Sequence, residues 1–114
     1  MGLREDVERQ ASRLAEIHQE HSVLTVELAD AKANYAGAKA AARLQSRADN
    51  PGWTVGEHAA QAELASLSSY RDLVICEERD KALRHEAHSI RQIMSTMQTV
   101  GRIEHDLTNA PIRR

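Results

Sequence analysis

The most constraining feature of this sequence is a seven-residue repeat of mainly apolar side chains that runs from Leu3 to Gln45 without a proline. Steps of three and four residues alternate over six repeats, and this spacing places the repeat positions on one narrow face of an α-helix. One position of the repeat is occupied by Val7, Leu14, His21, Leu28, Tyr35 and Ala42, and the other by Leu3, Gln10, Ile17, Leu24, Ala31, Ala38 and Gln45. The pattern predicts one long helix over residues 3–48 with a single buried seam.

A chain reversal is predicted at residues 49–54. Pro51 disfavours helical backbone at the residue before it, and the flanking Asn50 and Gly52 tolerate the left-handed backbone of tight turns. Thr54 and Glu57 have the spacing of a capping box, in which each side chain accepts a hydrogen bond from the other residue's backbone N–H. A second helix is therefore expected to begin at residue 55.

The second helix is predicted to cover residues 55–101, followed by a short segment over 102–107 and a flexible tail over 108–114. Its apolar stripe again steps by three and four residues. The stripe comprises Ala59, Ala62, Ser66, Ser69, Leu73, Cys76, Asp80, Leu83, Ala87, Ile90, Met94, Met97 and Gly101. Pro111 lies beyond it and indicates the end of regular structure.

Small side chains gather on both sides of the predicted turn. Alanine and glycine occupy much of residues 29–42, and alanine and serine occupy much of residues 59–69. If the chain folds back at Pro51, these stretches face each other, and small side chains allow helix axes to approach to roughly 8 Å. We therefore predict an all-α fold, a long antiparallel helical hairpin resembling a coiled coil, as a single domain over residues 1–107.

Two helices bury only one seam between them, and we expect other copies of the chain to cover the remaining apolar residues. The result would be a four-helix bundle or a higher oligomer. The expected interface is formed by large apolar side chains far from the turn, namely Leu14, Ile17, Leu24, Leu83, Ile90, Ile93, Met94 and Met97.

The overall charge favours neither nucleic acid nor a membrane, because 15 basic and 17 acidic side chains give a net charge of −2. No apolar run approaches the roughly 18–20 residues that cross a bilayer, so no membrane association is expected. Cys76 is the only cysteine, which excludes an intrachain disulfide and fits a reducing compartment. A cytoplasmic protein is expected.

The charge is unevenly distributed, however, and one basic stripe stands out near the turn. Its members step by 7, 4 and 4 residues along one helical face, and they are Lys32, Lys39, Arg43 and Arg47. A row of cations of this kind can contact phosphates, so nucleic acid is a candidate partner. The alternative interpretation is a solvated face whose cations pair with carboxylates of the second helix, such as Glu57 and Glu63.

Two histidine pairs, His18 with His21 and His85 with His88, are expected at a similar height in the hairpin. Imidazoles on facing helices can bind a metal ion, but the Glu-x-x-His pattern of di-metal bundles does not accompany them. Solvated or interfacial histidines are therefore the preferred interpretation, and no metal or cofactor is expected. The sequence also lacks a Ser-His-Asp set, a glycine-rich phosphate loop and paired carboxylates, so an enzyme is not expected.

Residues 53–100 resemble a family of small helical proteins encoded by bacteriophages and prophages, often beside recombination or single-strand-annealing genes. The similar segment begins with Thr54-Val55-Gly56-Glu57-His58-Ala59-Ala60-Gln61-Ala62 and continues through Tyr70-Arg71-Asp72 and Ile90-Arg91 to Met97-Gln98. The resemblance implies an accessory protein of phage DNA metabolism or host takeover, located in the host cytoplasm.

A helical hairpin of this size with a tryptophan at its turn is also similar to the secreted WXG-type proteins of Gram-positive bacteria. In this chain the turn reads Trp53-Thr54-Val55-Gly56, one residue longer than Trp-x-Gly, and the residue four positions after Tyr70 is Val74 rather than an acid. Three hypotheses follow. The first is a non-enzymatic interaction protein that binds itself and another protein, the second a nucleic-acid-binding accessory protein, and the third a secreted WXG-like hairpin.

Overall fold

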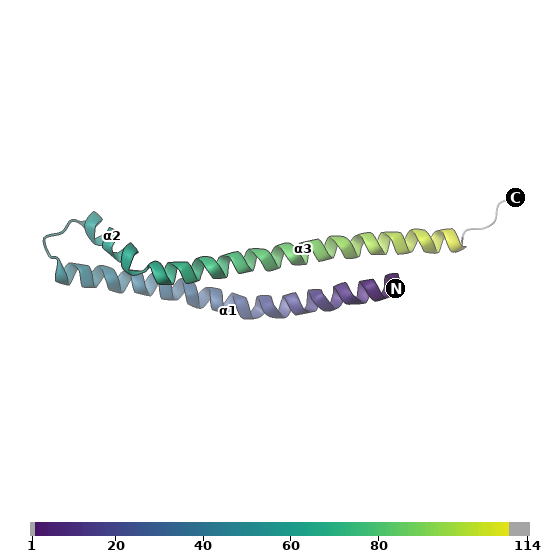
Figure 1. The fold of residues 1–114 in the computed structure, drawn as a ribbon, viewed down its shortest axis with the longest axis horizontal. Helices are drawn as coiled ribbons and strands as arrows, with labels where there is room; N and C mark the ends of the chain where they lie inside the picture. Colours follow the sequence, from purple (N-terminus) through teal and green to yellow (C-terminus); the bar gives the residue numbers. More distant parts are fainter. Residues whose placement is uncertain (1, 110–114) are drawn as a thin grey trace. The chain divides into compact units, whose positions relative to one another are not determined.

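The computed structural model describes residues 2–109, and these form three helices and no strand. Helix α1 spans Leu3–Asp49, α2 spans Val55–Ala65 and α3 spans Leu67–Asn109. Contacts between residues divide the chain into two units, one of residues 22–81 and one that combines the start of α1, through residue 21, with α3 from residue 82 onward. In each unit α1 lies beside the returning part of the chain and runs antiparallel to it (Figure 1). The predicted all-α helical hairpin is confirmed, and the single domain over residues 1–107 stays a prediction.

The chain reverses in a β-turn that begins at Asn50. The backbone N–H of Trp53 donates to the carbonyl oxygen of Asn50 at 3.1 Å, with Pro51 in the second position of the turn. No residue in the described part of the chain has a positive φ, so Gly52 does not use the left-handed backbone, and a type II turn, which needs it, is excluded. The geometry fits a type I turn, in which proline at the second position is favoured.

Helix α2 begins with the predicted cap. The Thr54 hydroxyl oxygen accepts a hydrogen bond from the backbone N–H of Glu57 at 3.2 Å. The carboxylate of Glu57 accepts a hydrogen bond from the same hydroxyl at 3.3 Å, rather than from the backbone N–H of Thr54 that the capping-box pattern suggested. The cap satisfies one of the backbone donors that a helix start leaves without an intrahelical partner.

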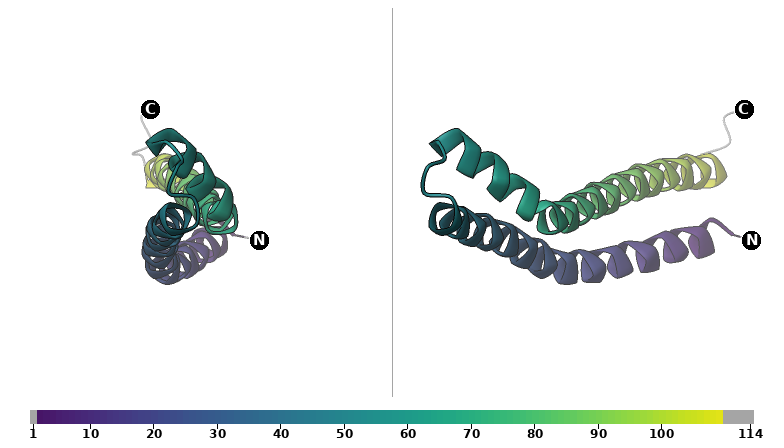
Figure 2. Two further views of the ribbon diagram at one scale, coloured as in Figure 1. Left: turned by 90° about the vertical axis from the view of Figure 1, so that its left-hand side faces the viewer. Right: turned by 60° about the vertical axis from the view of Figure 1, so that its left-hand side comes forward.

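The second arm of the hairpin is interrupted at Ser66, which the sequence-based prediction of one helix over 55–101 did not foresee. The Ser66 hydroxyl donates to the carbonyl oxygens of Ala62 at 2.6 Å and Glu63 at 3.3 Å, and such bonds compete with regular helical geometry. The helix resumes at once, because the N–H of Tyr70 donates to the carbonyl of Ser66 at 2.9 Å. Figure 2 shows α2 and the start of α3 meeting at an angle.

The far end of α3 also differs from the prediction. The helix continues to Asn109, so residues 102–107 are part of α3 rather than a separate segment. Residues 108 and 109, expected to belong to a flexible tail, are helical, and the rest of that expected tail, 110–114, lies outside the described residues. The helix therefore does not end at Gly101, the last position of the predicted stripe.

The buried seam follows the predicted repeat on both arms. On α1, Ile17, Leu24 and Ala31 are buried at intervals of seven residues. In the unit that contains both chain ends, Ile17 forms a buried cluster with Ala87 and Ile90, and the half-buried side chains packed against it are Leu14, Leu83 and Met94. Every position of the predicted stripe on the second arm is buried or half-buried.

One position of the seam on α1 was wrongly predicted. Gln45 is exposed, and the neighbouring Ser46 is buried instead. Ser46 lies opposite His58 of α2, where its hydroxyl is 2.7 Å from Nδ1 of the imidazole, and both side chains are more than 90% buried. The Trp53 ring lies 6.0 Å from the His58 ring. This buried hydrogen bond joins the two arms next to the turn.

An ion pair joins the arms in the unit that contains both chain ends. The Arg13 guanidinium donates to both carboxylate oxygens of Glu86, at 2.7 and 2.9 Å, and also to Glu16 and Glu20. The hydrogen bond from Arg13 lowers the pKa of the Glu86 carboxyl, and the same bond raises the pKa of Arg13. The two-pronged geometry orients one arm against the other as well as adding charge attraction.

Replacing Ser46 with alanine is expected to lower the free energy of unfolding by about 1–3 kcal/mol, because it leaves the buried Nδ1 of His58 without its partner. Urea denaturation followed by circular dichroism would measure the change. Ser12→Ala, at an exposed position of the same helix, is the matched control for the helix propensity of alanine. An equal effect of the two substitutions would contradict a stabilising role for the Ser46–His58 bond.

The Glu86 carboxylate is expected to make stability depend on pH. Its folded-state pKa lies below the ordinary value of 4.5, so its contribution is present above that value and is lost as the pH falls through the lowered pKa. Denaturation between neutral and acidic pH should show that the gap between the wild type and Glu86→Gln closes on acidification. Glu77→Gln, at an exposed position of α3, should show no such change, and a gap for Glu86→Gln that does not vary with pH would count against the assignment.

Candidate functional site

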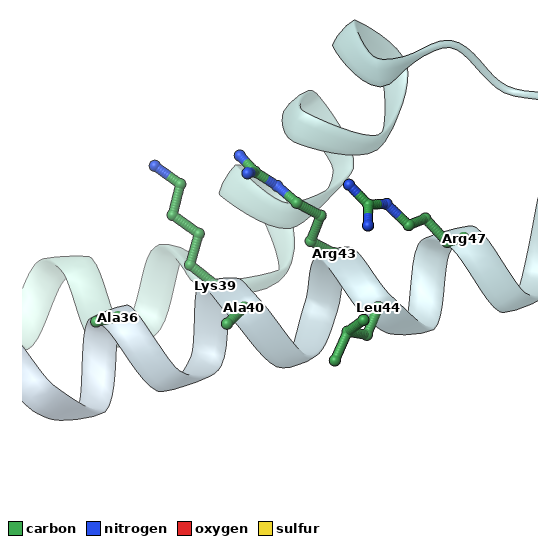
Figure 3. A pocket seen from close by; sticks show the side chains of 6 residues that line it. All are labelled: Ala36, Lys39, Ala40, Arg43, Leu44 and Arg47. Atoms are coloured by element: carbon green, nitrogen blue, oxygen red, sulfur yellow. The ribbon is translucent and has the colours of Figure 1, made fainter.

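The basic stripe predicted from the sequence lies on α1 within residues 22–81. We call Lys32, Lys39, Arg43 and Arg47 the cationic surface. Figure 3 shows Lys39, Arg43 and Arg47 extending to the same side of α1. These three side chains line a shallow groove together with Ala36, Ala40 and Leu44. Lys39 and Arg43 are half-buried, whereas Lys32 and Arg47 are exposed.

The cationic surface is poorly neutralised by the chain itself. The Lys39 ammonium lies 4.0 Å from a carboxylate oxygen of Glu63 and 5.6 Å from the centroid of the Tyr35 ring. Within residues 2–109, no hydrogen bond or ion pair is formed by the side chain of Lys32, Arg43 or Arg47. Of the two carboxylates expected to pair with the stripe, only Glu63 does so, since the side chain of Glu57 binds Thr54. Three of the four cations therefore remain available to an anionic ligand.

The residues predicted to form an oligomer interface are divided between the core and the surface. Ile17, Leu24 and Ile90 are at most 5% exposed, because they form the seam of the hairpin. Leu14, Leu83, Met94 and Met97 are half-buried, and Ile93 is 42% exposed. The predicted interface remains untested, and on the surface of this chain it would have to use the exposed and half-buried members.

Helix α3 carries a second row of apolar side chains, and two of its members, Ile93 and Met97, were predicted to belong to an oligomer interface. We call it the exposed α3 face, and it comprises Ile93, Met97, Val100, Ile103 and Leu107. At 3.6 residues per turn these positions fall within about one third of the helix circumference. All but the half-buried Met97 are exposed, from 42% at Ile93 and Val100 to 74% at Leu107.

Apart from Met97, which borders the seam, the exposed α3 face is separate from the face that packs against α1. A Cβ added at Gly101 would lie 3.0 Å from the Leu3 side chain, so Gly101 marks the side of α3 that faces α1. Ile90 and Met94 lie on that same side, about a quarter and a third of a turn from Val100 respectively. A shallow groove on the exposed α3 face is lined by Ser89, Gln92, Ile93, Thr96 and Met97.

The histidines do not form a metal centre in the described part of the chain. His18 and His21 line a small pocket with Arg84 and Arg91, and Nε2 of His18 lies 3.1 Å from a guanidinium nitrogen of Arg91. Arginines beside the imidazoles disfavour a metal cation by charge repulsion. His85 and His88 are exposed and do not line this pocket. No group of three or more potential ligand residues is found within residues 2–109.

Comparison with protein-family models, curated proteins and solved structures found no match to this chain. In the region that the structure describes, no helix has an apolar stretch long enough to cross a membrane. The resemblance to phage-encoded helical proteins therefore remains a prediction.

Proposed function

We propose that this chain is a non-enzymatic interaction protein that acts in the cytoplasm and pairs with a second copy of itself through the exposed α3 face. The observation that supports the proposal is the exposure of Val100, Ile103 and Leu107 on one face of a helix whose other face is already packed. Contiguous apolar side chains on the surface of a small protein are typical of sites that bind another protein.

The exposed α3 face is self-complementary when two copies of α3 run antiparallel. With Val100 on the two-fold axis, Ile93 of one copy faces Leu107 of the other, and Met97 faces Ile103. A two-fold axis requires each copy to use the same residues, and this spacing meets that requirement. Glu104, which lies on the same side of the helix, would face Thr96 rather than another charge. The occupant that fits the face is therefore a second copy of this chain.

Such a pair would bring together four helical arms, as in the predicted four-helix bundle. Each copy would keep its own seam, and the cores of the two copies would be joined only through α3. The cationic surface on α1 belongs to residues 22–81 and contributes no residue to this pairing. A further protein partner and a setting in phage DNA metabolism or host takeover, which the family resemblance implies, remain predictions.

The substitution Val100→Glu is expected to convert the dimer into a monomer, because the two-fold axis places the two new carboxylates opposite each other. Val100 is 42% exposed, so the helical content of the chain should be unchanged. Analytical ultracentrifugation at micromolar concentration measures the association state. Val26→Glu, at a more exposed position on α1, is the matched control and should remain dimeric.

A charge exchange gives the sharper form of this experiment. A mixture of Val100→Glu and Val100→Lys chains should form a heterodimer, although each variant alone should be monomeric, since opposite charges now meet on the axis. A wild-type chain that sediments as a monomer would contradict the proposal. So would a mixture of the two Val100 variants that forms no heterodimer.

A further inference from the structure

We propose that the cationic surface binds the phosphate backbone of a nucleic-acid duplex without reading its bases. The four cations lie within an arc of about 80° on one helix, and successive charges at Lys39, Arg43 and Arg47 rise by about 6 Å along its axis. The result is a straight row of positive charge about 22 Å long from Lys32 to Arg47. A polyanion with regularly repeated charges matches a row of this kind.

The row is available because the chain supplies almost no competing carboxylate. The segment from residue 31 to residue 48 contains no aspartate or glutamate. Among residues 2–109, Glu63 alone forms an ion pair with the row, and its contact with Lys39 is long at 4.0 Å and solvent-exposed, so it contributes little. The small side chains of Ala36 and Ala40 line the groove beside the cations and leave room for a phosphate backbone to approach the guanidinium groups of Arg43 and Arg47.

The aromatic residues favour a duplex over a single strand. Proteins that bind single strands without sequence preference stack the bases on aromatic side chains. This chain has only three aromatic side chains, and all three already pack against other rings. Tyr35 and Tyr70 meet edge to face at 5.3 Å, and Trp53 lies beside the His58 ring. The contacts that remain are charge contacts to phosphates, which carry no sequence information.

An acidic protein is a less suitable ligand for this surface. Protein interfaces combine charged rims with a buried apolar centre, and the only large apolar side chain that lines the groove is Leu44. Arginine donates hydrogen bonds to phosphate in a fixed, two-pronged geometry, and two of the three cations that line the groove are arginines. This inference does not depend on pairing through α3, because it uses different residues.

The test is fluorescence anisotropy of a labelled mixed-sequence DNA duplex titrated with the full chain over a range of salt concentrations. Three to four phosphate contacts predict a slope of log K against log salt of about −3, and hence a roughly 60-fold loss of affinity between about 50 and 200 mM salt. The double substitution Arg43→Gln/Arg47→Gln should reduce the steepness of the slope by about 2. Glu63→Gln should strengthen binding, since it removes the carboxylate that contacts Lys39.

The matched control is Arg4→Gln/Lys81→Gln, which changes the net charge equally at two exposed cations outside the surface and should leave the slope unchanged. If the Arg43→Gln/Arg47→Gln chain fails to fold, Lys32→Gln/Arg47→Gln provides the second variant, because both side chains are exposed, and it should also reduce the steepness of the slope by about 2. The inference would be overturned if the duplex does not bind at low salt, or if the control variant reduces the slope of log K against log salt as much as Arg43→Gln/Arg47→Gln does. It would also be overturned if the matching single strand or polyglutamate binds more tightly than the duplex.

Discussion

Each long helix of this protein buries only one narrow line of side chains, and the packing of that line against the returning arm holds the fold together. On α1 the buried apolar residues are Ile17, Leu24 and Ala31, one for every two turns of the helix. A helix in water gains little net stability from its backbone alone, so neither arm is expected to persist without the other. The β-turn after Asn50 is therefore as important as the seam, because it returns the second arm to cover the first.

The periodicity of the sequence predicted two helical arms and most of the seam, and Pro51 with the Thr54 cap predicted the reversal, because each depends on residues close together in the chain. Ser66 shows the limit of that approach. It occupies a regular position in the stripe, and only its side-chain bonds to the preceding carbonyls reveal the interruption. The buried bond between Ser46 and His58 depends on how the two arms meet beside the turn, which periodicity does not specify.

The two candidate surfaces could be predicted from the sequence to different degrees, because sequence patterns reveal the spacing along one helix but not the contacts between the two arms. The cationic surface was found because four like charges at helical spacing on one helix can be recognised without tertiary information. Whether carboxylates of the second arm pair with these cations could not be foreseen, and in the described part of the chain Glu63 alone does so, with Lys39. The exposed α3 face was predicted only in part. Ile93 and Met97 were expected in an interface, whereas Ile103 and Leu107 lay outside the second helix, which was expected to end at residue 101. Exposure on the folded chain, rather than hydrophobicity, distinguishes this face from the seam.

The central claim is that one chain folds back on itself, and intramolecular cross-linking tests it most directly. Cysteines introduced at positions 13 and 86, whose native side chains meet at 2.7 Å, would be linked by a short bis-maleimide in a Cys76→Ser background. Mixing isotopically light and heavy chains before the reaction separates links within a chain from links between chains. The account predicts that mass spectrometry will find the link within single chains. Links found only in mixed light–heavy pairs would contradict it.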